Sequence, residues 1–202
     1  MNKQLIIEQN KLAFEYLQKL YFEVSFFIKE IEGLLAKENE EFIIGRPGGY
    51  QMSTNHSNGL EPINVELWVL RKLAVFFVPK ESTHQKGGTT VTNIEGQTRI
   101  LYLRIVLDGK DIKEPTVYSG VLSNFKKKDK KYPEKIEQLM THIEYRESQV
   151  FKNPLSIEYE DGYLAFHGKL AKHNLFDMNS SKDIYEKIVM PALQAFRSEI
   201  KK

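Results

Sequence analysis

The chain contains no cysteine. Disulfide frameworks, thiolate nucleophiles and cysteine-based zinc sites are therefore excluded. An excess of charge of one sign is also missing, because 29 lysine and arginine residues face 27 aspartate and glutamate residues and leave a net charge of +2. The chain as a whole therefore offers no electrostatic basis for binding nucleic acid or acidic lipid.

Long apolar runs are missing too. The N-terminal segment MNKQLIIEQNK has an apolar run of only three residues, which does not fit a secretory signal. No stretch approaches the roughly 18 uncharged apolar residues of a membrane-spanning helix. We therefore expect a cytoplasmic protein that does not enter a membrane.

The size and the composition are those of an ordinary globular domain. The chain has 202 residues, of which 41% are hydrophobic and 28% charged. We found no repeat and no linker in the sequence. Residues 1–202 are therefore predicted to form a single domain.

Residues 4–37 are predicted to form one long helix, because apolar residues recur at alternating three- and four-residue steps over four heptads. The stripe consists of Ile6, Ala13, Leu17, Leu20, Val24, Phe27, Ile31 and Leu34. The segment LYFEVSFFI is apolar nearly all round, so the helix must be covered on more than one side. The cover is either the sheet of the same chain or the same helix of a second subunit. We predict a homodimer with Phe27 and Ile31 in the contact.

Alternating apolar and polar residues predict a strand at 63–79, with a break near Arg71 and Lys72. Residues 99–107 are predicted to form a central strand, because apolar residues lie on both of its faces, and residues 115–125 form the next strand. Residues 82–97 are polar and contain glycine, which indicates a loop or an exposed hairpin tip.

A hairpin is predicted around Asp161-Gly162, which two alternating runs flank. A two-residue turn there would place Tyr159 opposite Leu164 and Ile157 opposite Phe166. These four side chains would then share the core face.

Two further helices are predicted. One covers residues 132–149, with Pro133 in its first turn. The other begins near Ser180, and Pro191 should kink or divide it. The order of elements predicts an α+β fold: one mainly antiparallel sheet of about five to six strands, with the long N-terminal helix and the two further helices packed on it.

The glycine-rich segment 45–59, GRPGGYQMSTNHSNG, could bind phosphate only if its glycines led into a helix carrying Lys-Ser/Thr. No such helix start follows, and the next predicted element is a strand. QKGGTT at 85–90 fails the same test. We expect residues 45–59 to be mobile, with Tyr50 as the residue that docks on a protein partner.

Two groups of residues suggest metal chemistry. His167 lies on the face of the predicted hairpin that bears Glu158, and with His173 it could bind zinc or iron. The spacing matches no HExxH-type helix, however, and His173 lies past the end of the strand. Asp108 follows an apolar strand, and with Asp111 it could hold Mg²⁺ for phosphoryl transfer. Because Asp-Gly at a strand end is typical of a turn, we expect no metal site and no cofactor. His142, near Glu144 and Arg146, is interpreted as part of a surface charge cluster.

The segment NFKKKDKKYPEK is the one concentrated positive charge. Its lysines lie between Phe125 and Tyr132, and lysines beside aromatic rings can contact phosphates while bases stack. A solvated connection explains the segment equally well. The nucleic-acid-binding candidates are Lys126, Lys127, Lys128, Lys130 and Lys131.

No stretch matches a motif specific enough to identify a family. The first hypothesis is a non-catalytic cytoplasmic binding, regulatory or adaptor module that self-associates through residues 4–37. One alternative is a nucleic-acid-associated protein that uses the lysines of 126–131. Another is an enzyme with a metal-dependent phosphoryl-transfer site near Asp108.

Overall fold

The computed structural model describes residues 3–38, 42–45, 70–86, 89–92, 94, 96–109 and 112–198. The chain divides into two compact units, Met1–Glu40 and Glu41–Lys202. The structure confirms the α+β class predicted from the sequence, because it combines a long helix, further helices and an antiparallel sheet. The single-domain organisation of residues 1–202 stays a prediction.

The first unit consists of one helix, α1 (Lys3–Lys37), which has 35 residues. Its bounds confirm the helix predicted at 4–37. Exposed ion pairs one turn apart, such as Lys11 with Glu15, lie along its polar side.

The second unit is built on a six-stranded antiparallel sheet in the order β1-β2-β5-β6-β8-β7. Its strands are β1 (Phe42–Gly45), β2 (Lys72–Pro79), β5 (Ile100–Val106), β6 (Thr116–Lys127), β7 (Ile157–Glu160) and β8 (Leu164–Asn174). A short 3₁₀ turn, η3 (Lys80–Ser82), leads to a second sheet of β3 (Thr83–Lys86) and β4 (Thr89–Thr92). Of the two alternatives for residues 82–97, a loop or a hairpin, the antiparallel pairing of β3 with β4 supports the hairpin. Residues 63–69 of the longer predicted strand lie outside the described residues.

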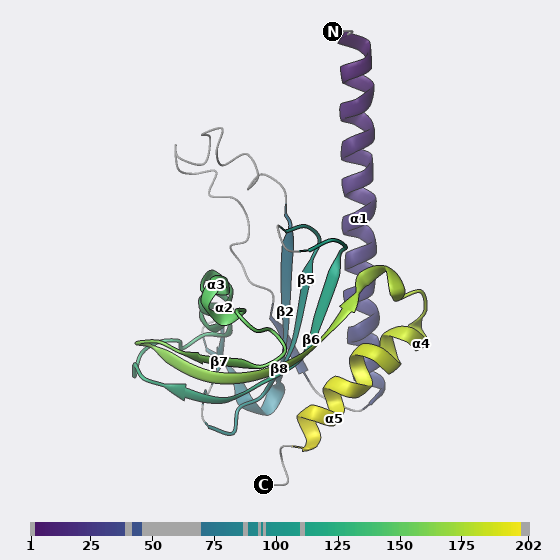
Figure 1. Ribbon diagram of the computed structural model, residues 1–202. Coiled ribbons are helices and arrows are strands. Elements are labelled where there is room, and N and C mark those ends of the chain that lie inside the picture. Colours follow the sequence, from purple (N-terminus) through teal and green to yellow (C-terminus); the bar gives the residue numbers. More distant parts are fainter. Residues whose placement is uncertain are drawn as a thin grey trace. The chain divides into compact units, whose positions relative to one another are not determined.

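The main sheet bends strongly within β6 and β8. The far ends of these strands, together with β7, run across the direction of β2 and β5 (Figure 1). Glycine permits the bend, because a Cβ atom on Gly120 would overlap the backbone carbonyl oxygen of Lys169. A Cβ atom on Gly168 would lie 2.7 Å from a methyl group of Leu122.

A β-bulge at residues 124–125 changes which side chains face outward. The register passes from Ser123 opposite His167 to Lys126 opposite Ala165, so two residues of β6 face one of β8. Asn124 takes a left-handed φ of 55°, a conformation that asparagine tolerates better than most residues. The bulge buries Phe125 and leaves Asn124 and Lys126 exposed.

The main hydrophobic core lies between one face of the sheet and the helices α2 (Ile136–Tyr145) and α3 (Glu147–Val150). α2 contributes its predicted stripe, which is fully buried: Ile136, Leu139, Met140 and Ile143. The sheet contributes Phe76, Tyr102, Leu122 and Phe166 among others. The predicted single helix over 132–149 is wrong in two respects: it starts at Ile136, with Pro133 before it, and Arg146 separates it into two helices.

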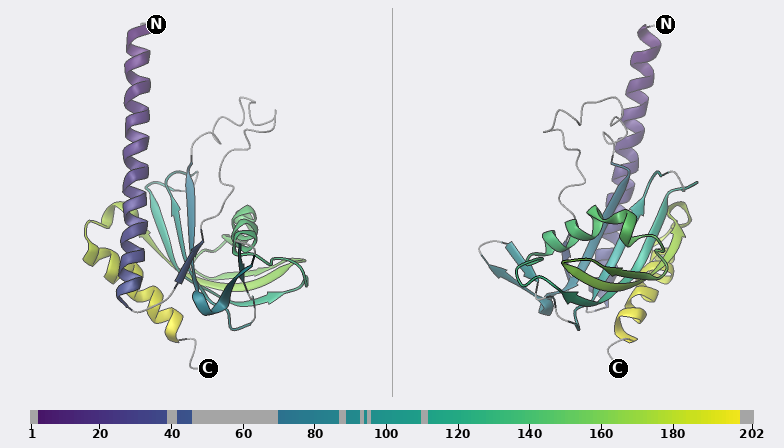
Figure 2. Two further views of the ribbon diagram at one scale, coloured as in Figure 1. Left: turned by 180° about the vertical axis from the view of Figure 1, so that it is seen from behind. Right: turned by 60° about the vertical axis from the view of Figure 1, so that its left-hand side comes forward.

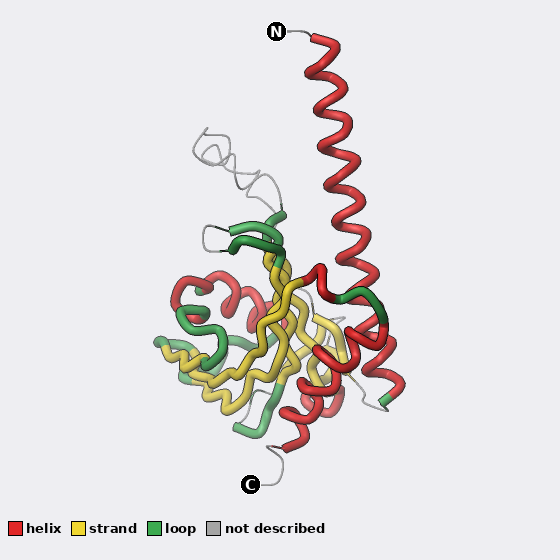
Figure 3. Tube along the Cα trace, turned by 45° about the vertical axis from the view of Figure 1, so that its right-hand side comes forward, coloured by secondary structure: helices red, strands yellow, loops and turns green. Residues whose placement is uncertain are grey.

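The C-terminal helical segment packs on the opposite face, where it contacts β5 and β6 (Figures 1 and 2). After a 3₁₀ turn, η4 (Leu175–Asp177), it comprises α4 (Ser181–Ile184), the π-helical turn η5 (Tyr185–Val189) and α5 (Met190–Ser198), drawn as helix in Figure 3. Ser180 caps α4 by accepting a hydrogen bond from the backbone N–H of Asp183, as its spacing predicted. The π-helical turn divides the helix just before Pro191, whose ring would clash with the preceding turn of a regular α-helix.

The β7–β8 hairpin keeps the predicted core face but not the predicted register. Tyr159 lies opposite Phe166 and Ile157 opposite Gly168, so every pair is shifted by two residues. The cause is the turn, in which the Asp161 carboxylate accepts the backbone N–H groups of Tyr163 and Leu164 and stabilises a longer loop. A shift of two residues preserves the side-chain alternation, so the core face was predicted correctly.

Candidate functional site

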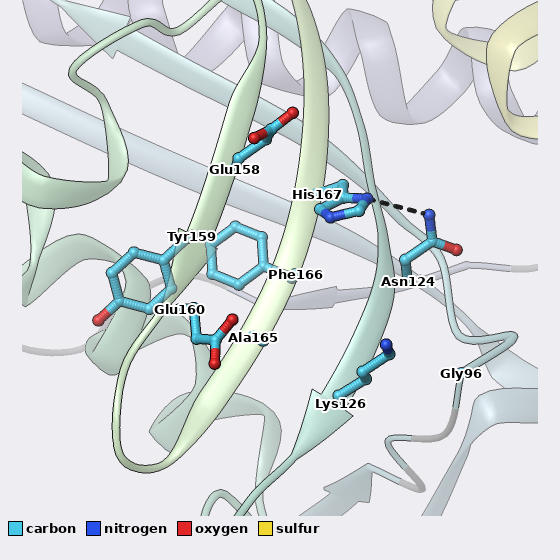
Figure 4. Close-up of a pocket in the computed structure, with 9 residues that line it drawn as sticks. All are labelled: Gly96, Asn124, Lys126, Glu158, Tyr159, Glu160, Ala165, Phe166 and His167. Atoms are coloured by element: carbon cyan, nitrogen blue, oxygen red, sulfur yellow. Dashed lines mark hydrogen bonds between the residues drawn. The ribbon is translucent and has the colours of Figure 1, made fainter.

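A hollow on the outer face of β6, β8 and β7 is the candidate binding site of the second unit (Figure 4). It has a volume of about 580 Å³. Its lining consists of Gly96, Asn124, Lys126, Glu158, Tyr159, Glu160, Ala165, Phe166 and His167. We call it the β6–β8–β7 hollow.

The strand register explains why a hollow forms there. Lys126, Ala165 and Glu160 form one row across the three strands, because Ala165 pairs with Lys126 on one side and with Glu160 on the other. The small Ala165 side chain leaves space between two long charged side chains (Figure 4). The β6 bulge is necessary for this row, because it turns Lys126 to the outer face.

A second row runs beside the first. His167 lies directly opposite Glu158, and the side chain of Asn124 reaches its ring, with 3.3 Å between Asn124 Nδ2 and His167 Nδ1. An amide NH₂ group only donates, so with Nδ2 of Asn124 facing the ring, Nδ1 of His167 is assigned as the acceptor and Nε2 as the nitrogen that carries the proton. His167 is therefore assigned as a donor through Nε2.

The two acidic residues of the hollow differ in their surroundings. Lys128 forms an ion pair with Glu160, and this hydrogen bond, with the charges of Lys128 and Lys126, lowers the pKa of the Glu160 carboxyl group. Glu158 stands two residues earlier on the same exposed face of β7. Both carboxylates are therefore directed outward, where they can meet a ligand in water.

The structure also places the predicted lysine run. Lys126 and Lys127 end β6, and the following lysines lie in the connection to α2. Lys126 lines the hollow, Lys128 is paired with Glu160, and Lys130 and Lys131 are exposed. The positive charge is therefore partly offset by acidic groups of β7. Nucleic-acid binding by these lysines stays a prediction.

The residues suggested for metal chemistry do not come together. His167 and His173 stand six residues apart on β8, which separates their Cα atoms by about 20 Å. Asp108 forms an ion pair with Arg71, and Asp111 lies outside the described residues. Within the described ranges, no three histidine, aspartate or glutamate side chains are grouped so that they could hold a metal ion.

His142 is not part of a surface charge cluster, and that interpretation was wrong. Its side chain is 5% exposed, and its Nε2 lies 2.8 Å from Oδ2 of Asp161. The Tyr159 hydroxyl donates to the same carboxylate oxygen at 2.7 Å. The rings of Tyr132 and Tyr163 pack against the imidazole. These contacts join α2 to the β7–β8 turn. We call the five residues that make them the hairpin clamp: His142, Asp161, Tyr159, Tyr132 and Tyr163.

Glu144 is buried as well, in an ion-pair network between α2, α3 and the sheet. Arg104 donates to Glu144 over 2.6 Å and also bonds to Glu147, which in turn binds Lys72. The Tyr102 hydroxyl donates to Glu144, and burial, followed by the Glu144 charge, raises the pKa of Tyr102. The polar groups of this ion-pair network bind one another, so we assign the network a structural role.

The structure describes two of the three residues predicted to bind partners. Phe27 and Ile31 lie one helical turn apart on one face of α1. Tyr50 lies outside the described residues. Their roles stay predictions.

Sequence reasoning placed Glu158 and His167 on one face but missed the hollow. The available signal was a small residue, Ala165, at an outward position of an alternating strand. Its meaning depended on the neighbouring strands, because Lys126 and Glu160 become its partners only through pairing.

Comparison of the chain with protein-family models, with curated protein sequences and with solved structures found no match. None of the described helices combines the length and the apolar character that crossing a bilayer requires.

Proposed function

We propose that this protein is a non-catalytic binding module whose ligand site is the β6–β8–β7 hollow. The observation that carries the proposal is the row Lys126–Ala165–Glu160, in which a small residue separates two opposite charges. The volume of about 580 Å³ falls within the range of small-molecule sites. The ionisable groups around it are those that fix a polar ligand by ion pairs and hydrogen bonds.

Binding is favoured over catalysis because of where the ionisable groups stand. Catalytic sites commonly exclude water from their reacting groups. Glu158 and His167 stand on an exposed sheet face. The buried His142 and Glu144 are engaged in the hairpin clamp and the ion-pair network.

A titration followed by amide chemical shifts in NMR spectra tests the binding site. Small polar fragments should shift the amide signals of residues 124–126, 158–160 and 165–167. Ala165→Leu should abolish these shifts by filling the hollow. Lys169→Leu, an exposed position on the same strand outside the lining, should leave them unchanged. Shifts that Ala165→Leu leaves intact would contradict the assignment.

We further propose that the protein self-associates through α1. A single helix has no interior of its own, so its apolar stripe must be covered by something outside α1. The heptad spacing suits a second copy of the same helix. We also propose a cytoplasmic location, which the cysteine-free composition supports.

The solution mass tests self-association. Replacing both Phe27 and Ile31 with Asp should convert a dimer into a folded monomer or an insoluble chain, as light scattering after gel filtration would show. Replacing Lys11 and Lys19 with Asp reverses the charge at two positions outside the apolar stripe, so this control should leave the dimer intact. A soluble Phe27→Asp, Ile31→Asp variant with unchanged mass would rule out this contact.

A further inference from the structure

We propose that the β6–β8–β7 hollow binds a small linear zwitterion, with the ligand's ammonium group over β7 and its acid group over β6 and β8. This inference rests on the proposed binding function. Charges of both signs line the hollow but come from different strands, since Glu158 and Glu160 belong to β7 and Lys126 to β6 (Figure 4).

The ammonium end follows from the spacing of the two glutamates. Residues two apart on one strand face are separated by about 6.7 Å. An ammonium group midway lies about 3.4 Å along the strand from each glutamate, so small side-chain rotations bring both carboxylates to the roughly 2.8 Å of a charge-assisted hydrogen bond. Glu160 already accepts from Lys128, but a carboxylate has two oxygens and can accept a second donor.

The acid end follows from the donors on the other side of Ala165. Lys126 carries an ammonium group with three donors, and Figure 4 shows it across Ala165 from Glu160. His167 adds its Nε2–H, because Nδ1 is occupied by Asn124. A carboxylate or phosphate oxygen between Lys126 and His167 would accept from both.

The register also sets the length of the ligand. The backbones of Lys126 and Glu160 stand two strand spacings apart, about 10 Å, and side chains perpendicular to the sheet keep this distance between their charged groups. A hydrogen bond of about 2.8 Å at each end leaves roughly 4–5 Å between the ligand's charged groups. An α-amino acid, with about 3 Å between amine and acid, is too short, whereas 4-aminobutanoate spans the distance.

The mixed charge disfavours ligands of a single sign. A simple anion at Lys126 would also face Glu158 and Glu160, and a simple cation at the glutamates would face Lys126 and Lys128. A zwitterion meets attraction at both ends.

Isothermal titration calorimetry on the full chain at low salt tests the inference with four probes: 4-aminobutanoate, glycine, n-butylamine and butanoate. We expect 4-aminobutanoate to bind at least about tenfold more tightly than each of the other three. Glu158→Gln and Lys126→Gln should each weaken its binding about tenfold or more. The matched variants Glu137→Gln and Lys169→Gln, exposed and outside the lining, should bind as the wild type does.

The outcomes separate this inference from the proposed function. Equal affinities for the four probes would overturn the proposal that the ligand is a zwitterion. A preference for butanoate that Glu158→Gln does not change would overturn it as well. If other fragments still shift the hollow's amide signals in that case, the binding function stands and only the ligand class is wrong. If no probe or fragment perturbs the hollow, both proposals fail.

Discussion

His142 of α2 and Asp161 of the β7–β8 turn are joined by a hydrogen bond of 2.8 Å between Nε2 and Oδ2. The other oxygen of Asp161 accepts the backbone N–H groups of Tyr163 and Leu164, both at 2.8 Å. One carboxylate therefore holds the turn and fastens it to a helix. The hollow depends on this hairpin, because β7 and β8 carry most of its lining.

The stability of the fold should therefore depend on the charge of Asp161. Burial raises the pKa of this carboxyl group, but the hydrogen bonds from Tyr159 and from the backbone of Tyr163 and Leu164 prevail and lower it to about 2. A carboxyl group with a lowered pKa stabilises the fold above its unfolded value of about 3.9 and loses this effect as the pH falls toward 2.

Asp161→Asn should remove about 1–2 kcal/mol of stabilisation at neutral pH. Urea unfolding at a series of pH values measures this, and the difference between wild type and variant should shrink between about pH 4 and about pH 2. Asp177→Asn, at an exposed position, serves as the control. A difference that is the same at every pH would contradict the role of the Asp161 charge.

Arg104 should be essential to the ion-pair network. Its side chain is 6% exposed, and Glu144, which it binds, is 2% exposed. Arg104→Met would leave the buried Glu144 carboxylate without its cation, so we expect a loss of about 3–5 kcal/mol in the free energy of unfolding. The double variant with Glu144→Leu should recover part of this loss, because it removes the uncompensated charge.

The exposed pair of Lys182 and Glu186 offers a control for this experiment. Lys182→Met should change the free energy of unfolding by less than about 1 kcal/mol. A comparably small effect of Arg104→Met in urea unfolding would show that the network contributes little.

Gly120 should not tolerate a side chain. The methyl group of Gly120→Ala would overlap the backbone carbonyl oxygen of Lys169, and only a shift of the β8 backbone would relieve this. We expect a loss of more than about 2 kcal/mol, measured by chemical denaturation. Gly162→Ala is the matched control, since its methyl group would meet nothing within 4 Å. Equal stability of the two variants would argue against the close approach of β6 and β8.

The lysines of 126–131 should account for any affinity toward nucleic acid. Replacing Lys126, Lys127, Lys128, Lys130 and Lys131 with Gln should abolish binding to a single-stranded oligonucleotide in fluorescence anisotropy. Wild-type binding should weaken steeply from low to physiological salt, because neutralised phosphates release counterions. Glu160→Gln should strengthen it by freeing Lys128. Binding that does not respond to salt would exclude this mechanism.

Local patterns predicted the long helix, most strands of the main sheet and the faces that they bury, whereas β1 was not predicted. The apolar residues on both faces of 99–107 predicted a central strand, and β5 lies between β2 and β6 with its residues buried. The spacing of Ile136, Leu139, Met140 and Ile143 predicted the buried side of α2. Such patterns are reliable because they depend only on the period of the element itself.

The sequence did not predict features that depend on contacts between residues distant in the chain or on side-chain hydrogen bonds within a turn. The hairpin register shifted because Asp161 accepts backbone N–H groups, which a two-residue turn does not require. His142 was placed on the surface because nothing near it in sequence indicated a partner, and Asp161 lies 19 residues away.

The sequence alone thus determined the fold class, the long helix, most strands of the main sheet and their core faces, since each follows from a repeating local pattern. Only the tertiary structure decided where the hollow lies. The bulge at Asn124 turns Lys126 outward, and strand pairing sets Ala165 between Lys126 and Glu160. Because the three strands come from separate parts of the chain, their side chains become neighbours only when the hydrogen bonds of the sheet fix the register.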